Sequence, residues 1–349
     1  MSTPDLSEEQ EVSASDQARR LRNGLISVVV LVAVVVGLLL AVPGLHGVGD
    51  VVADMSPGWV AAAVALEIAS CVGFIVIFLG VFDRVPVVFG ARVALSEMAF
   101  GAAVSLGGAG SIAVGAWLLH ERGVAGREIA ERSAVLFLLT SAINLITLAL
   151  FGLGLGLGIL PGPQKPLLTV VPGVLSIALF GLFVAVPRLT ARGATGAGRL
   201  ARVLGATGST IRATTQTLFQ PDWRLLGAIA YLWCDIAVLW ACFKAIGPAP
   251  PIAVIVLSYQ IGYLANVLPI PGNIGSLEAG FVGMLVLYGA RATPSTAAAI
   301  VYHAIALWIP AIWGTIAFVR LRRSHREPYT PRPPREERAQ LRRSRRGLR

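Results

Sequence analysis

The feature that most constrains this chain is a series of apolar runs, each long enough to cross a lipid bilayer. The run from Gly24 to Val42 contains no charged residue, and a bilayer core takes about 20 apolar residues. Over all 349 residues, 55% are hydrophobic and 14% are charged, whereas soluble domains are about 25% charged. We therefore predict a polytopic membrane protein, which excludes a disordered chain, a disulfide scaffold and a soluble α/β enzyme.

Six apolar runs are predicted to be full membrane spans: 24–44, 58–82, 133–159, 167–187, 223–246 and 296–319. Two further segments, 93–119 and 252–290, are interrupted by Gly and Pro, so each is predicted to form two shorter helical arms around a break. The expected fold is all-α, with six full spans and two broken or re-entrant helical hairpins. Each hairpin is either re-entrant or a pair of short full crossings.

Arginine placement indicates that the first interrupted segment returns to the side from which it enters. The N-terminal arginines, the 188–222 loop and the C-terminal tail then share one side with Arg84, Arg92, Arg122, Arg127 and Arg132. The opposite side keeps mainly Lys165 and Arg291. Because cytoplasmic loops carry an excess of Lys and Arg, we expect both termini to be cytoplasmic.

The net charge of +10 is concentrated in the tail, where residues 320–349 hold twelve Arg and three Glu. Such a segment after the last span is typical of attraction to anionic lipid. Nucleic-acid binding is not expected, because the tail has no folded platform and only Tyr329 as an aromatic residue. We predict a polar cytoplasmic leader at 1–23, a transmembrane domain at 24–323 and a basic Pro/Arg-rich tail at 324–349.

Two halves of the chain resemble each other, with the first at about 24–160 and the second at about 166–320. Pro57-Gly58-Trp59 and Pro221-Asp222-Trp223 open matching spans, and a Leu-Ser pair follows each Trp by 36 and 34 residues. GSIAVG at 110–115 then matches GSLEAG at 275–280. Because three spans separate equivalent points, the second half is expected to have the opposite orientation in the membrane. Inverted repeats with broken helices are typical of transporters whose binding site lies near the membrane midplane.

A few ionisable side chains are predicted to lie at membrane depth, where a charge costs about 2.5–3.5 kcal/mol. They are candidate binding or coupling residues: Glu67, Glu97, Asp235, Glu278 and His303. His303 is either a proton carrier or a hydrogen-bonded packing residue. Three cysteines lie inside apolar runs without a CxxC pair, so we predict packing roles for them and no metal or cofactor. Gly152 and Gly156 have the small-xxx-small spacing that predicts a helix-packing seam.

The most specific motif is PIPGNIGSLEAG at 269–280, which predicts a helix N-terminus held at depth. Prolines end the first arm, a glycine permits the reversal, and a polar residue caps a helix whose first turn holds Glu278. Free N–H groups there suit a phosphate or carboxylate; the structural alternative is that Glu278 caps its own helix. The candidate site residues of this motif are Pro269, Pro271, Gly272, Asn273, Gly275, Ser276 and Glu278, with Ser111 in the matching first break.

This motif, together with SLGGAGSIAVGAWLLHERG at 105–123 and YHAIALWIPAIWGTIAFVRLRR at 302–323, resembles the lysylphosphatidylglycerol synthase transmembrane-domain family. The resemblance implies a flippase-like protein of the bacterial cytoplasmic membrane that moves a lipid between leaflets. Complete synthases continue into a soluble domain that transfers lysine from tRNA to the lipid, whereas only the basic tail follows here, so no enzyme activity is expected. Many relatives carry an acid and an arginine where this chain has Ser111 and Val114.

Three functions remain open from the sequence. The first is a flippase for a lipid or a lipid-linked headgroup, with anionic lipids as partners and proton coupling as an option. The second is a transporter of a small soluble solute. The third is a non-catalytic scaffold that binds a lipid-synthesis enzyme or a second copy of the chain.

Overall fold

The computed structural model describes residues 46–103, 109–193, 211–212, 214–215, 223–262 and 276–323, and this part of the chain consists of helices and turns. The chain divides into two compact units, Met1–Asp54 and Met55–Arg349. The described part of the first unit contains the short helix α2 (His46–Ala53). All other described helices belong to the second unit, and they confirm the predicted all-α fold.

Five helices of the second unit are long and apolar enough to cross a membrane. They are α3 (Pro57–Val81), α6 (Gly126–Gly156), α7 (Pro166–Gly193), α9 (Arg224–Ile246) and α12 (Ala292–Arg323). These helices coincide with five of the six predicted full spans. The first predicted span, 24–44, lies outside the described residues.

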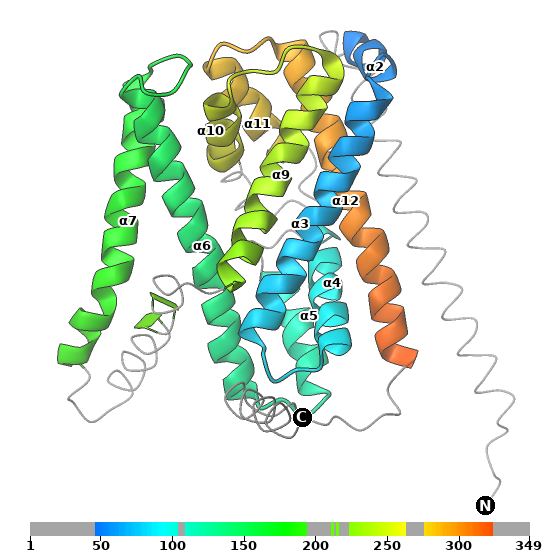
Figure 1. Cartoon of the computed structure of the whole chain (residues 1–349), viewed down its shortest axis with the longest axis vertical. Helices are drawn as coiled ribbons and strands as arrows, with labels where there is room; N and C mark the ends of the chain where they lie inside the picture. Colours follow the sequence, from blue (N-terminus) through cyan, green and yellow to red (C-terminus); the bar gives the residue numbers. More distant parts are fainter. Residues whose placement is uncertain are drawn as a thin grey trace, which may run out of the picture. The chain divides into compact units, whose positions relative to one another are not determined.

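Each interrupted segment consists of two helices, as the glycines and prolines predict. The first contains α4 (Val87–Ala103) and α5 (Ala109–His120), and the second contains α10 (Ile252–Gly262) and α11 (Ser276–Leu287). The two helices of each pair pack against each other (Figure 1). α5, α10 and α11 have 12, 11 and 12 residues, so each is about 18 Å long or less, well short of a bilayer core of about 30 Å.

The first hairpin begins and ends beside the start of α6. The guanidinium carbon of Arg122, two residues after α5, lies 4.9 Å from the ring centroid of Phe89 near the start of α4. After α5, a short turn leads into α6 at Gly126. The α4–α5 segment therefore returns to the end from which it enters.

The second hairpin begins and ends beside the turn that joins α6 to α7. Lys165 Nζ donates a hydrogen bond to the carbonyl oxygen of Leu287, at the end of α11, over 2.6 Å. At the start of α10, Val254 packs against Gly162, where an added Cβ would lie 3.3 Å from a Val254 methyl. The two hairpins thus adjoin opposite ends of α6.

Arg132 joins the start of α6 to the turn between α3 and α4. Its Nη1 lies 2.8 Å from Asp83 Oδ1 and also donates to the carbonyl of Val81, while its Nε lies 3.1 Å from Glu128 Oε1. This contact fixes the end of the bundle that carries most of the described arginines.

Glycines set the closest helix contacts. A Cβ on Gly73 of α3 would lie 2.6 Å from the backbone nitrogen of Tyr231 and 2.9 Å from the carbonyl oxygen of Gly227 on α9. A Cβ on Gly227 would lie 2.9 Å from the carbonyl oxygen of Gly73 in return. Near one end of this pair, Ser56 N donates to the carbonyl of Ala245 over 2.9 Å. α3 and α9 are therefore antiparallel helices whose backbones touch.

The predicted glycine seam on α6 is confirmed as a packing surface for α7. A Cβ on Gly152 would lie 2.7 Å from the carbonyl oxygen of Thr169, and one on Gly156 would lie 3.1 Å from the Thr169 hydroxyl. Small residues here let two apolar helices approach closely. α7 lies on the side of α6 away from α3 and α12 (Figure 1).

Candidate functional site

The contact between α3 and α9 brings two acidic side chains into the interior of the bundle. Glu67 on α3 is only 3% exposed, and Asp235 on α9 is close enough for the two carboxyl groups to interact electrostatically. Cys71 Sγ donates to Glu67 Oε1 over 3.8 Å, and Glu67 Oε2 has no hydrogen-bond partner in the part of the chain that the structure describes. The backbone contact at Gly73 and Gly227 explains how residues on two different spans come so close.

Asp235 is held by two tyrosine hydroxyl groups from other helices. Tyr259 Oη, on α10, donates to Asp235 Oδ2 over 2.5 Å. Tyr302 Oη, on α12, donates to Asp235 Oδ1 over 3.0 Å. Each oxygen of the carboxylate therefore accepts a hydrogen bond, and such bonds stabilise its charged form.

An aromatic contact positions these tyrosines and includes the helix that follows the PIPGNIG break. The ring of Phe281, on α11, stacks on Tyr259 and packs against Tyr302, with centroid distances of 5.5 Å in both pairs. Phe281 is completely buried, and both tyrosines are nearly so. The second hairpin is thereby packed directly beside the acidic residues.

We call Glu67, Asp235, Tyr259 and Tyr302 the acid–tyrosine cluster. Its members come from α3 and α9, the first and fourth of the five long described helices, from α10 of the second hairpin, and from α12, the last long helix. A group of carboxyl and hydroxyl oxygens inside an apolar bundle can bind a proton, a cation or the polar part of a ligand. No three His, Cys, Asp or Glu side chains of the described residues gather in a way that could hold a metal ion.

Glu97 is not among the residues that this cluster's hydrogen bonds join. It lies on α4 and faces α5, the other helix of the first hairpin. It is 5% exposed, and its Oε2 has no hydrogen-bond partner within the described ranges. A Cβ on Gly115 of α5 would lie 2.7 Å from the Glu97 carboxyl carbon. The carboxyl group therefore packs against the α5 backbone, where only a glycine leaves it room.

Of the other predicted site residues, His303 follows Tyr302 on α12 and is partly buried. Ser111 lies on α5 where α4 and α5 approach, since a Cβ on Gly101 would be 3.2 Å from the Ser111 Cβ. Ser276 and Glu278 are the first and third residues of α11, and their side chains are outside the described part. Pro269, Pro271, Gly272, Asn273 and Gly275 also lie outside the described residues.

Sequence reasoning identified Glu67 and Asp235 but missed the two tyrosines that hold Asp235. A buried tyrosine hydroxyl needs a hydrogen-bond partner, so Tyr259 and Tyr302 inside apolar runs were a usable signal. Cys71 was assigned to packing, yet it lies four residues after Glu67, the spacing at which helical side chains meet.

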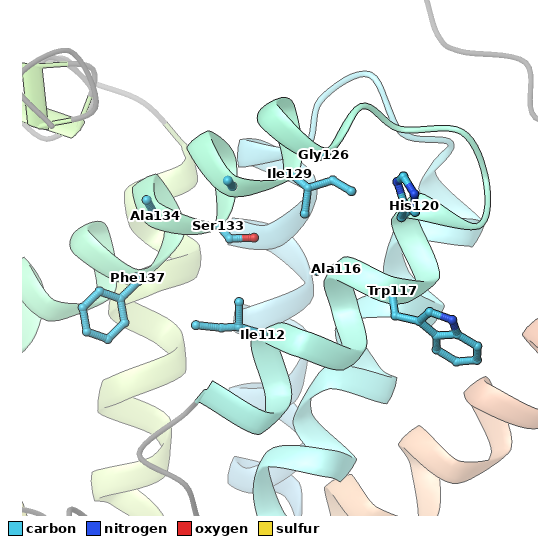
Figure 2. Close-up of a pocket in the computed structure, with 10 residues that line it drawn as sticks. Ile112, Ala116, Trp117, His120, Gly126, Ile129, Ser133, Ala134 and Phe137 are labelled. Atoms are coloured by element: carbon cyan, nitrogen blue, oxygen red, sulfur yellow. The ribbon is translucent and has the colours of Figure 1, made fainter. Parts of the chain in front are cut away.

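A second feature is an apolar groove of about 600 Å³ between α5 and α6. Figure 2 shows Ile112 and Ser133 pointing into the space between the two helices, with Phe137 and His120 at its two ends. Phe137 is 55% exposed, so the groove opens to the outside of the bundle.

Comparison with known proteins gives two findings. A family model described as the lysylphosphatidylglycerol synthase TM region matches residues 25–314. A UPF0104 membrane protein of Methanothermobacter thermautotrophicus is 33% identical over 90 residues, which are 25% of this chain and 26% of that protein. The second match thus spans about a quarter of the curated relative's length.

Proposed function

Because this chain belongs to the family of the lysylphosphatidylglycerol synthase transmembrane region, we propose that it is a flippase-like transporter that moves a lipid or a lipid-linked headgroup between leaflets. The observation that carries the proposal is the acid–tyrosine cluster, in which Asp235 is held by hydroxyl groups from α10 and α12 inside a membrane bundle. Ionisable groups at such depth usually mark a substrate or ion pathway.

In this proposal, polar surfaces of the protein bind the lipid headgroup and apolar surfaces contact the acyl chains. The headgroup would enter the bundle beside the second hairpin, whose Phe281 packs against both tyrosines. The free N–H groups at the start of α11 would hold an anionic headgroup. The acyl chains would stay outside, where the α5–α6 groove is lined by apolar side chains such as Ile112 and Phe137.

The test is leaflet exchange of fluorescent phospholipids in vesicles that contain the purified full chain. We expect exchange with the parent protein, and at least a tenfold slower rate for Asp235→Asn, since an amide no longer accepts from both tyrosines as a carboxylate does. Glu131→Gln is the matched control, because that carboxylate lies at the protein surface and pairs with Arg127. It should exchange lipid at the parent rate.

Uptake of soluble solutes into the same vesicles separates the alternatives. Uptake of an amino acid or sugar without lipid exchange would support a solute transporter. Absence of both activities in a correctly inserted protein would contradict transport and favour a scaffold for a lipid-synthesis enzyme.

A further inference from the structure

We propose that Glu67 and Asp235 form a single proton-binding site, in which Asp235 is the carboxylate and Glu67 carries the exchangeable proton. The inference rests on the proposed function only where it assigns this proton a role in driving lipid movement. Proton binding itself follows from how differently the two carboxyl groups are surrounded.

Asp235 has the surroundings of an anion. Both of its oxygens accept a hydrogen bond, from Tyr259 at 2.5 Å and from Tyr302 at 3.0 Å. Two O–H donors, one to each oxygen, stabilise the charged carboxylate over the protonated acid. Neither tyrosine is free to turn away, because their rings are packed against the buried ring of Phe281.

Glu67 has the surroundings of a neutral acid. Its only described donor is the weak S–H group of Cys71 at 3.8 Å. Its second oxygen, in a side chain that is 97% buried, has no donor among the described residues. Two ionised carboxyl groups close enough to interact electrostatically would also repel each other in an apolar interior. A proton on Glu67 Oε2 removes the charge and the repulsion together.

The other titratable groups near the pair leave this assignment unchanged. No Lys or Arg of the described residues is bonded to either carboxyl group, and the charged residues of α6 lie in its first two turns, far from its middle. Glu97 of α4 faces α5 instead. The groups that face the pair from the packed helices are Cys71 on α3, Cys234 on α9, Tyr259 on α10 and Tyr302 on α12. His303 is the residue after Tyr302 on α12.

The proton step is simple to state. When the cluster is open to one side of the membrane, a water-borne proton forms an O–H bond with Glu67 Oε2. When the cluster opens to the other side, this bond breaks and the proton returns to water. Asp235 keeps its negative charge throughout, and a cycle therefore moves one proton with the substrate.

Carbodiimide labelling of the full-length protein in detergent tests the site without any lipid movement, because hydrophobic carbodiimides modify protonated carboxyl groups in apolar surroundings. Mass spectrometry then locates the label. We expect label on Glu67 and none on Asp235, with Glu67 labelling falling as the pH rises. At the pH of half-maximal labelling, Asp235→Asn should lower Glu67 labelling at least threefold, since the neighbouring charge that favours protonation is gone.

Glu97 is the internal control, because it is similarly buried and no acidic side chain of the described residues acts on it; its labelling should not change in Asp235→Asn. If Asp235→Asn does not fold, Tyr302→Phe serves instead, and it should bring label onto Asp235 by removing one donor. Label on Asp235 in the parent, an unchanged Glu67 yield in Asp235→Asn, or no label on Asp235 in Tyr302→Phe would overturn the site. A protein that labels as expected but exchanges no lipid would contradict only the proposed function.

Discussion

At the scale of single residues, the described carboxyl groups inside the bundle differ in the donors around them. Asp235 accepts from two tyrosines, Glu67 from one thiol, and Glu97 lies against the glycine backbone of α5. Because hydrogen-bond donors and neighbouring charges decide the protonation of a buried acid, residues of one chemical type have different roles here. Burial alone would not distinguish Glu67 from Glu97, which are 3% and 5% exposed.

Glu278 provides a test of the PIPGNIG motif at this scale. Glu278→Gln keeps the size of the side chain and removes its titration, so transport should lose the part of its pH dependence that Glu278 contributes, while Glu67 keeps its own and membrane insertion stays normal. Lipid exchange measured between pH 5 and 8 in vesicles checks this. Glu97→Gln, without a Pro-Gly break beside it, should have a smaller effect; equal transport by parent and Glu278→Gln at every pH would make the motif structural.

Part of the site could be predicted from the sequence, because charges inside apolar runs are rare and therefore visible. Glu67 and Asp235 were found in this way. The proximity of Glu67 and Asp235 was not predicted, because it depends on the position along each helix at which α3 and α9 cross. A shift of one helical turn changes that position by about 5.4 Å. The tyrosine partners of Asp235 come from helices 24 and 67 residues further along the chain, beyond the reach of local spacing.

At the scale of helices, backbone contacts between glycines organise the bundle. Gly73→Ala places a Cβ 2.6 Å from the backbone of Tyr231, and a backbone atom cannot move aside as a side chain can. We expect the free energy of unfolding in detergent to fall by about 1–3 kcal/mol, as for other overpacked interiors.

Gly181→Ala on α7 is the matched control for this substitution, because a Cβ there would meet nothing within 4 Å. Alanine is the better helix former by roughly 0.5–1 kcal/mol, so the control should be neutral or slightly stabilising. Equal losses in the two variants would show that the Gly73 contact is not a tight one.

Arg132 provides a second test at this scale, since it bridges α6 and the α3–α4 turn. Its side chain is 25% exposed and that of Asp83 is 17% exposed, so Arg132→Gln removes a partly buried ion pair and should lower the unfolding free energy by about 1–2 kcal/mol. Thermal unfolding in detergent measures the loss. Arg127→Gln, at a side chain 90% exposed, should leave the midpoint unchanged, because exposed pairs contribute little.

Helix types and approximate bounds were the most predictable part of the fold, because long apolar runs and Gly or Pro interruptions leave few alternatives. The predicted span 58–82 is α3 at Pro57–Val81, and 223–246 is α9 at Arg224–Ile246. The start of α6 was less accurate: it begins at Gly126, seven residues before the predicted 133. The extra turns carry Arg127, Glu128, Glu131 and Arg132. Because these residues are charged, a prediction based on apolar runs does not include them in the helix.

At the scale of the whole molecule, the two hairpins return to opposite ends of the bundle, so labelling from the two sides of the membrane should separate those ends. Arg127→Cys and Arg291→Cys, each in a background in which Cys71, Cys234 and Cys242 are replaced, should react with a membrane-impermeant maleimide from opposite sides. We expect the cytoplasmic label at residue 127, because that end carries most of the arginines. Labelling of both from one side would contradict the inverted arrangement of the halves.

The backbone contact between Gly73 and Gly227 also has a mechanical consequence. The backbones of α3 and α9 touch there, and the Ser70 hydrogen bond to the Tyr231 carbonyl and the Phe74–Tyr231 ring contact lie beside that point, so a tilt of α9 against α3 turns about it. One end of the pair is joined by the edge-to-face rings of Trp59 and Trp240, 5.3 Å apart, and at the other end Arg224 lies over Gly80. A tilt that separates one end presses the other together, so the two ends of the helix pair cannot open at the same time.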